Sequence, residues 1–208
     1  MATAIAIRDF ERQRRRERRR EELLDAADRV IRRSGLAFSM DEIAGEAGIT
    51  KPVLYRHFGD KDGLNEALTE RYISQLKRVL RPAAQTDDPR SRLAATIDAY
   101  LSYVEREPDR YRFLLAAAEQ PRTGALVAEF RREHIGGCAF TSVPKLERAG
   151  LDPGFAEHWA QCVSGMIRAA GASWLESRSL PRERLVDYLT TVLWDGFDVL
   201  STRASDPA

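Results

Sequence analysis

The chain has 208 residues, of which 43% are hydrophobic and 31% charged, and its formal net charge at pH 7 is +1. This length allows one large domain or a small domain joined to a larger one, and the abundance of Leu, Ala, Arg and Glu favours helices. No run of about 18 apolar residues occurs, which excludes a membrane-spanning helix, and we expect a cytoplasmic protein because the N-terminal apolar residues precede the charges, unlike a secretory signal.

Positive charge is concentrated near the N-terminus. Residues 8–20 contain eight arginines and only three acidic residues, although the chain as a whole is close to neutral. A basic segment on a neutral body predicts a polyanionic partner at one end of the molecule. The alternative is a solvated charge run at a disordered terminus, and for Arg8 and Arg12 taken singly we favour that alternative.

Two helical patterns follow this basic segment. The first covers residues 17–33, where apolar residues recur at helical spacing until "SGLAF" closes the run. Ser39, followed three residues later by Glu42, forms a capping-box pattern. This pattern begins a second, short helix that ends at Gly48.

A third helix is predicted over residues 51–58. Thr50 can serve as its N-cap, and Pro52 stands in the first turn, where a missing N–H costs nothing. Only "GIT" separates the second and third helices, and Gly48 gives this corner the backbone freedom that a tight turn needs. Two short helices joined in this way form a helix-turn-helix.

The third helix carries side chains suited to reading DNA. The second helix of a helix-turn-helix lies in the major groove with its N-terminal residues near the bases, where Lys51 can donate to guanine and Pro52 can pack on a thymine methyl. The arginine cluster can run along the DNA backbone or enter the minor groove. The groups expected to hold phosphates are Arg18, Arg19, Ser39, Thr50, Tyr55, Arg56 and His57.

A long fourth helix is predicted after Gly59, and it ends before Pro82. Helical spacing of apolar residues then continues to the C-terminus. We therefore expect an all-α fold, in which an N-terminal three-helix helix-turn-helix domain is joined by the fourth helix to a helical domain for ligand binding and dimerisation. The expected ranges are 1–20 for a basic N-terminal arm, 21–66 for the DNA-binding domain and 67–208 for the effector-binding and dimerisation domain.

Residues 20–72 resemble the DNA-binding domain of the TetR family of transcriptional regulators. The resemblance lies in the "IAGEAG" helix and in "TKPVLYRHFGDKDGL", which reproduces the family's recognition helix and the start of its fourth helix. It implies a homodimer that binds a palindromic operator in double-stranded DNA and represses until a small molecule enters the C-terminal domain. By similarity, Lys51 and Pro52 approach bases, whereas Arg56 stands where the family varies. The phosphate-binding residues implied by the resemblance are Thr50, Tyr55, His57 and Lys61.

The last two helical segments are apolar on two faces, so each needs two partners. We expect them to pair with their copies across a two-fold axis; the alternative is that both helices are central in the core of a single chain. The residues expected at the dimer interface are Gly165, Ala169, Ala172, Leu185, Leu189, Val192, Gly196 and Val199.

An apolar or amphipathic effector, such as a lipid, an acyl chain or an aromatic compound, is expected because large apolar residues are frequent between residues 64 and 175 and obvious buried charges are few. Taken singly, each of these residues is more often core than pocket. The candidate lining consists of Tyr100, Tyr103, Tyr111, Phe113, Leu114, Phe130, Phe140, Trp159, Met166 and Trp174.

Two His-x-x-x-Cys pairs, His134 with Cys138 and His158 with Cys162, have the one-turn spacing of a zinc or thiol redox site. We favour ordinary core packing for these cysteines and expect no metal and no cofactor. The chain lacks a nucleophile elbow, a phosphate-binding glycine loop and a dinucleotide fingerprint, so an enzyme is not expected. The remaining alternative is a regulator-like protein that acts mainly through a protein partner, with DNA binding secondary.

Overall fold

The computed structural model describes residues 2–85, 87–133, 152 and 154–204, and these residues form helices and connecting turns without a strand. The all-α expectation is confirmed. None of the helices among these residues is long and apolar enough to cross a membrane. The helices in chain order are α1 (Ala2–Ser34), α2 (Met40–Glu46), α3 (Lys51–Phe58), α4 (Lys61–Leu80), the short 3₁₀ helix η1 (Ala83–Gln85), α5 (Pro89–Arg106), α6 (Pro108–Ala118), a helix that includes residues 121–133, α8 (Phe155–Ser177) and α9 (Arg182–Ala204).

Local signals determine where α2 and α3 begin. Ser39 accepts a hydrogen bond from the backbone N–H of Glu42 (3.2 Å), and the Glu42 carboxylate accepts one from the Ser39 N–H (2.7 Å), which completes a capping box. Pro52 lies in the first turn of α3. Gly48 turns the corner between the two helices with a φ of 63°, a left-handed conformation that favours glycine.

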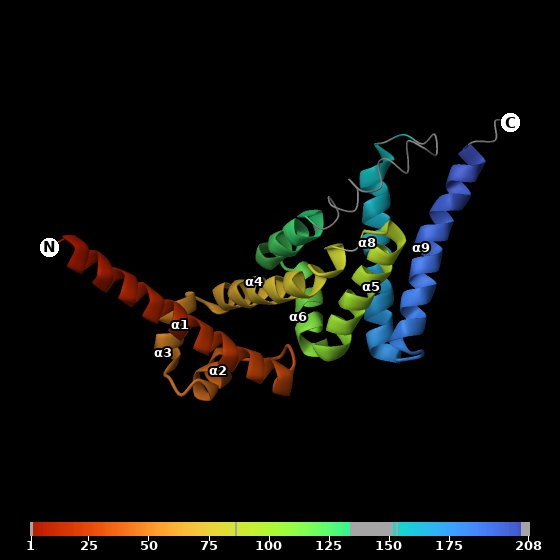
Figure 1. The fold of residues 1–208 in the computed structure, drawn as a ribbon. Helices are drawn as coiled ribbons and strands as arrows, with labels where there is room; N and C mark the ends of the chain where they lie inside the picture. The colour runs from red at the N-terminus through yellow and green to blue at the C-terminus, as the bar shows by residue number, and fades with distance from the viewer. Residues whose placement is uncertain (1, 86, 134–151, 153, 205–208) are drawn as a thin grey trace.

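The start expected for the first helix at Glu17 is wrong, because α1 begins at Ala2 and runs without a break into the helix-turn-helix. Its first half has no apolar repeat, but arginine, glutamate and glutamine are strong helix formers. Neighbouring turns are joined by side chains: Gln13 donates to Glu17 (2.8 Å) and Arg19 pairs with Glu22 (2.8 Å). The N-terminal end of α1 projects from the rest of the molecule (Figure 1).

One apolar core extends from the helix-turn-helix into the C-terminal helices. The α6 side chain Phe113 joins the two parts: its ring stacks on Phe38 at 6.4 Å and meets Tyr72 of α4 edge-on at 5.3 Å. Tyr72 is fully buried. Through Phe38 and α1, the helix-turn-helix thus packs directly against α6, in addition to being joined to it through α4.

The helix α5 packs against α9, α8 and α6 (Figure 1). Arg182, at the start of α9, pairs with Asp98 (2.9 Å) and Glu105 (2.8 Å) of α5. In Figure 1, α8 and α9 lie at the far end of the molecule from the projecting end of α1. The two ends of the fold are therefore available for different contacts.

Candidate nucleic-acid interface

The helix α3 buries one side and exposes the other. Leu54 and Phe58 are buried against the helix-turn-helix core, whereas Lys51, Pro52 and Tyr55 are exposed. Arg56 is also exposed, and His57 is half-buried. Hence every α3 side chain expected at DNA lies wholly or partly at the surface.

Lys51 is held at the N-terminal end of α3 by Asp41 of α2, with 2.8 Å between Nζ and Oδ2. This hydrogen bond, with the attraction of the Asp41 charge, raises the pKa of Lys51, so the side chain is a cation at neutral pH. Both partners are solvent-exposed, and ion pairs of this kind are weak. Lys51 can therefore exchange Asp41 for a base edge in the major groove.

Two of the expected phosphate ligands already have partners within the chain. The Ser39 hydroxyl accepts from the Glu42 N–H and donates to the Glu42 carboxylate (2.9 Å), so it serves the helix cap. Lys61 donates to the carbonyl oxygen of Phe38 (2.8 Å), and its ammonium lies 4.7 Å from the centre of the Phe38 ring. Since an ammonium has three donors, Lys61 keeps donors for a phosphate. Thr50 makes no side-chain cap bond, and its side chain is exposed.

A basic hollow of about 810 Å³ lies between the first half of α1 and the C-terminal end of α3. We call it the α1–α3 groove. It is open to solvent, and five guanidinium groups share it with one imidazole and one carboxylate. The lining residues are Glu11, Arg12, Arg15, Arg16, Arg19, Arg56 and His57.

The sequence predicts that Arg19, Arg56 and His57 hold phosphates and that the arginine cluster, with Arg15 and Arg16, can run along DNA. It does not predict that these groups share one hollow, and it favours a solvated Arg12. A signal was present, because Arg12, Arg15, Arg16 and Arg19 are spaced i, i+3, i+4 and i+7 and so fall on one side of a helix. This spacing places the arginines on one side only if the helix begins before Glu17, because three of the four precede that residue.

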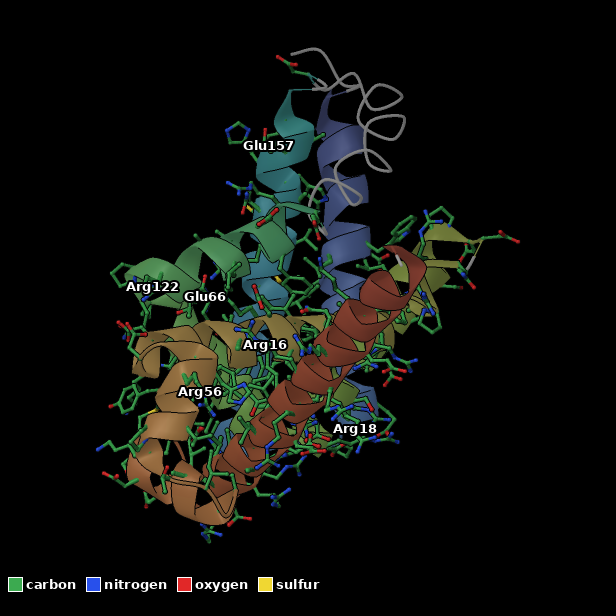
Figure 2. The ribbon with its side chains drawn as sticks, turned by 90° about the vertical axis from the view of Figure 1, so that its left-hand side faces the viewer. Arg16, Arg18, Arg56, Glu66, Arg122 and Glu157 are labelled. Carbon is green, nitrogen blue, oxygen red and sulfur yellow. The ribbon has the colours of Figure 1, made fainter. Side chains whose placement is uncertain are left out.

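Arg18, expected at DNA together with Arg19, lies on another side of α1. Figure 2 shows Arg16 on the edge of α1 towards α3 and Arg56, and Arg18 on the opposite edge. The Arg18 side chain is 85% exposed, and its closest ion-pair contact is Glu22 at 3.7 Å. Arg19 lines the groove but also pairs with Glu22.

His57 is kept neutral by its surroundings. Partial burial lowers the pKa of His57, and the positive charges of Arg56, Arg16, Arg19 and Arg20 lower it further. A neutral imidazole can donate or accept a hydrogen bond but adds no charge to the groove.

The residues expected to line an effector pocket fall into different environments. Five are buried in the core: Tyr103, Tyr111, Phe113, Leu114 and Trp174. Tyr100, Phe130 and Trp159 are half-buried and pack against that core, whereas Met166 is 41% exposed on α8. Phe140 lies outside the described residues.

Two of these tyrosines are joined to each other and to α8. The Tyr100 hydroxyl donates to that of Tyr111 (3.0 Å), which donates to the backbone oxygen of Arg168 (3.2 Å). A separate open hollow of about 330 Å³ lies between α4 and the helix over 121–133. It includes only one of the expected residues, Phe130, beside Ile73 and Leu126 and three glutamates.

The residues expected at a dimer interface are also divided. Leu189 is buried in the core of its own chain, and Leu185 packs against that core, because this side of α9 meets α5. Ala169, Val192 and Gly196 are exposed, Gly165 and Ala172 are half-buried, and the side chain of Val199 lies outside the described residues. The exposed apolar residues on α8 and α9 also include Phe155, Met166 and Tyr188.

The second His-Cys pair shows no sign of a metal site. His158 Nδ1 lies 3.4 Å from the carbonyl oxygen of Gly154, and Cys162 is an exposed free thiol. Within the described residues, no three His, Cys, Asp or Glu side chains are close enough together to hold a metal ion. His134 and Cys138 lie outside those residues.

The helices α1 to α3 thus define a helix-turn-helix protein with a basic, exposed recognition surface. Residues 23–68 match the family description "Bacterial regulatory proteins, tetR family", and residues 77–208 match "Tetracyclin repressor-like, C-terminal domain". The chain belongs to the TetR family of transcriptional regulators.

Relatives and solved structures agree with this assignment. An uncharacterized HTH-type transcriptional regulator of Mycobacterium tuberculosis, Rv0472c, is 32% identical over 85% of this chain and 76% of its own length. The HTH-type transcriptional activator FasR of Mycolicibacterium smegmatis is 30% identical over 87% of this chain and 84% of its own.

Among solved structures, a TetR-like transcriptional regulator from Rhodococcus sp. RHA1 has a TM-score of 0.66 at 25% identity, covering 86% of this chain and 96% of that one. A tetR-family transcriptional regulator from Streptomyces coelicolor has a TM-score of 0.65 at 24% identity, covering 90% and 88%, and this likeness shows the fold alone. The family and these relatives are transcriptional regulators, not enzymes.

Proposed function

We propose that this protein is a sequence-specific, ligand-responsive repressor that binds a palindromic operator in double-stranded DNA as a homodimer in the cytoplasm. The observation that carries the proposal is the exposed face of α3, with Lys51 and Pro52 at its N-terminal end and Tyr55, Arg56 and His57 following. In a helix-turn-helix, that end of the helix meets base edges and the remainder meets phosphates.

A homodimer is supported by the apolar surface of α8 and α9. Phe155, Met166, Tyr188 and Val192 are between 39% and 56% exposed, at the end of the molecule away from α3 (Figure 1). Large apolar side chains exposed on the same two helices are typical of a protein interface. Two copies joined there would present two α3 helices, as a palindromic operator requires.

Ligand response is supported by the direct packing of α6 on the helix-turn-helix. An effector can lower DNA affinity only if it binds the non-DNA conformation better, and a tenfold loss corresponds to about 1.4 kcal/mol of that difference. We infer an apolar or amphipathic effector from the aromatic composition of the C-terminal helices. Native mass spectrometry of the purified protein, which detects co-purified apolar compounds, tests this part of the proposal.

Selection of binding sites from random duplex DNA, at a stated salt concentration, tests the DNA-binding function. We expect an enriched palindrome, and we expect Lys51→Ala to relax base preference at one position of each half-site while Tyr55→Phe weakens binding to all sequences alike. Equal loss of specific and non-specific binding in Lys51→Ala would remove its role in base reading.

Two other outcomes lead to different functions. Binding without an enriched sequence would favour the alternative, a regulator-like protein that acts mainly through a protein partner. FasR is an activator, which makes activation from the same operator the second candidate. A reporter gene placed behind the selected operator distinguishes repression from activation.

A further inference from the structure

We propose that the α1–α3 groove is a second DNA-binding element, which holds the phosphate backbone of one strand beyond the bases that α3 reads. The proposal rests on the DNA-binding function proposed above and names a further part of the surface that performs it. The occupant is a run of consecutive phosphodiester groups of the same duplex.

The groove arginines of α1 form one row along the helix. On a helix with 3.6 residues per turn, Arg12, Arg15, Arg16 and Arg19 fall within about 100° of the circumference. All four line the groove. From Arg12 to Arg19 the helix rises about 10 Å, which matches the axial rise of about three phosphates on one DNA strand. The arginine row is therefore long enough to contact about three consecutive phosphates.

The groove carries an excess of positive charge. Within the described residues, no ion pair or hydrogen bond joins Arg12, Arg15, Arg16 or Arg56 to an acidic side chain, and Glu11 is the one carboxylate in the groove lining. Guanidinium groups left without carboxylates attract polyanions and release bound counterions on binding. Burial lowers the pKa of His57, and the charges of Arg56, Arg16 and Arg19 lower it further.

The two walls of the groove, α1 and α3, are held together. Arg20 places its guanidinium 5.0 Å from the centre of the Phe58 ring, which ties α1 to the end of α3. Leu23 and Leu24 of α1 are buried in the same core as Leu54 of α3. Because α1 is one uninterrupted helix, its basic half cannot turn independently of the recognition helix. A strand seated in the groove is consequently held in a constant position relative to α3.

Arg78 and Arg81 supply a control. Both are exposed at the C-terminal end of α4, a helix of 20 residues that begins beside α3, so they lie about 25–30 Å along that helix from its start. Substitution of either pair by glutamine removes two positive charges from exposed positions. Glutamine and arginine have similar helix propensities, so both helices are preserved.

The experiment measures affinity for a random-sequence duplex and for the selected operator at several salt concentrations. We expect Arg12→Gln/Arg16→Gln to reduce the slope of log affinity against log salt by about 2, because each phosphate contact contributes about 0.9. Arg78→Gln/Arg81→Gln should leave the slope within about half a unit of the wild type. Hydroxyl-radical footprinting should show that only the first variant loses protection of the backbone flanking each half-site.

Equal changes of the salt slope in the two variants, or no change in either, would overturn the groove proposal. The proposed function would still stand if the wild type binds the operator. Absence of any wild-type DNA binding would overturn both. Circular dichroism confirms that each variant keeps its helices. Tight binding of inorganic pyrophosphate by the wild type, with unchanged DNA slopes in both variants, would assign the groove to a small anion instead.

Discussion

Asp28 is a buried carboxylate at which three helices meet. It accepts two hydrogen bonds from the Arg110 guanidinium of α6, both 2.7 Å long, one from the Tyr72 hydroxyl of α4 (2.9 Å) and one from Arg32 of α1 (3.1 Å). Burial alone would raise the pKa of Asp28, but these hydrogen bonds and the Arg110 charge outweigh burial and lower the pKa from 3.8 to about 2. Asp28 thus joins the DNA-proximal helices to the C-terminal domain.

Replacement of Asp28 by asparagine should be strongly destabilising. The Arg110 guanidinium, whose pKa is raised first by its hydrogen bond to Asp28, would remain charged and partly buried, with the more exposed Glu107 (3.2 Å) as its remaining counterion. Removal of one partner of a buried pair costs about 3–5 kcal/mol. Asp25→Asn, on the same helix, removes an exposed partner of Arg71 and should cost less than about 1 kcal/mol. Denaturant unfolding of both variants measures the difference, and equal costs would contradict it.

The same carboxylate predicts a pH dependence. Since the folded-state pKa of Asp28 is lower than the unfolded value, its contribution is complete above pH 3.8 and is lost as the pH falls towards 2. The loss should amount to roughly 2 kcal/mol of the free energy of unfolding. Urea unfolding between these pH values should show it in the wild type. The free energy of unfolding should fall more steeply across this range in the wild type than in Asp28→Asn. Equal falls in the two proteins would contradict the role given to Asp28.

At the scale of elements, the corner between α3 and α4 depends on close approach of the backbone. A Cβ atom added at Gly63, in the first turn of α4, would lie 2.0 Å from the carbonyl oxygen of Phe58. A Cβ at Gly45 of α2 meets no atom within 4 Å. Alanine at Gly63 therefore measures the cost of overpacking, whereas alanine at Gly45 measures the gain in helix propensity.

The substitution Gly63→Ala should destabilise the protein by about 1–3 kcal/mol, because the α3–α4 corner must open to admit a methyl group. Gly45→Ala should instead stabilise it by about 0.5–1 kcal/mol, since alanine loses less backbone freedom in a helix. Thermal unfolding compares the two, and shifts of the same sign would show that the corner is not close-packed.

The elements that could be predicted are those with local signals. The capping box at Ser39 and the proline at position 52 specify the starts of α2 and α3 through hydrogen bonds and backbone angles a few residues away. The first half of α1 carries no apolar repeat, so periodicity could not identify it as helix. For the same reason the sequence does not predict the α1–α3 groove. It does predict that the arginine cluster binds phosphates.

At the scale of the whole molecule, the exposed apolar surface of α8 and α9 predicts the state of assembly. Val192 is 56% exposed on α9, and a glutamate there should prevent two copies from associating, because its charge would be buried without a partner. Val79, 40% exposed on α4, allows the same substitution away from this surface. Light scattering at micromolar concentration should give a dimer for Val79→Glu and a monomer for Val192→Glu. A monomeric wild type would exclude the dimer.

Contacts between distant parts of the chain were beyond prediction from the sequence. One stripe on α9 contains both Leu189 and Val192, yet the first is buried against its own chain and the second is exposed, because α5 covers only one side of the helix. Asp28 and Arg110 are 82 residues apart, and neither has a local pattern that reveals the pair. Periodicity indicates that a face is apolar and leaves open what covers it.

Because α1 is one continuous helix, a small tilt near Asp28 moves its distant N-terminal half by a larger distance. Asp28, where α6 holds the helix, and Arg12, near the start of its basic half, are 16 residues apart, a distance of about 24 Å along a rigid rod. A tilt of α1 to α3 together, by about 10° about Asp28, would therefore displace Arg12 by about 4 Å, more than the length of a hydrogen bond. A small movement of α6 would be magnified at the far tip of the helix.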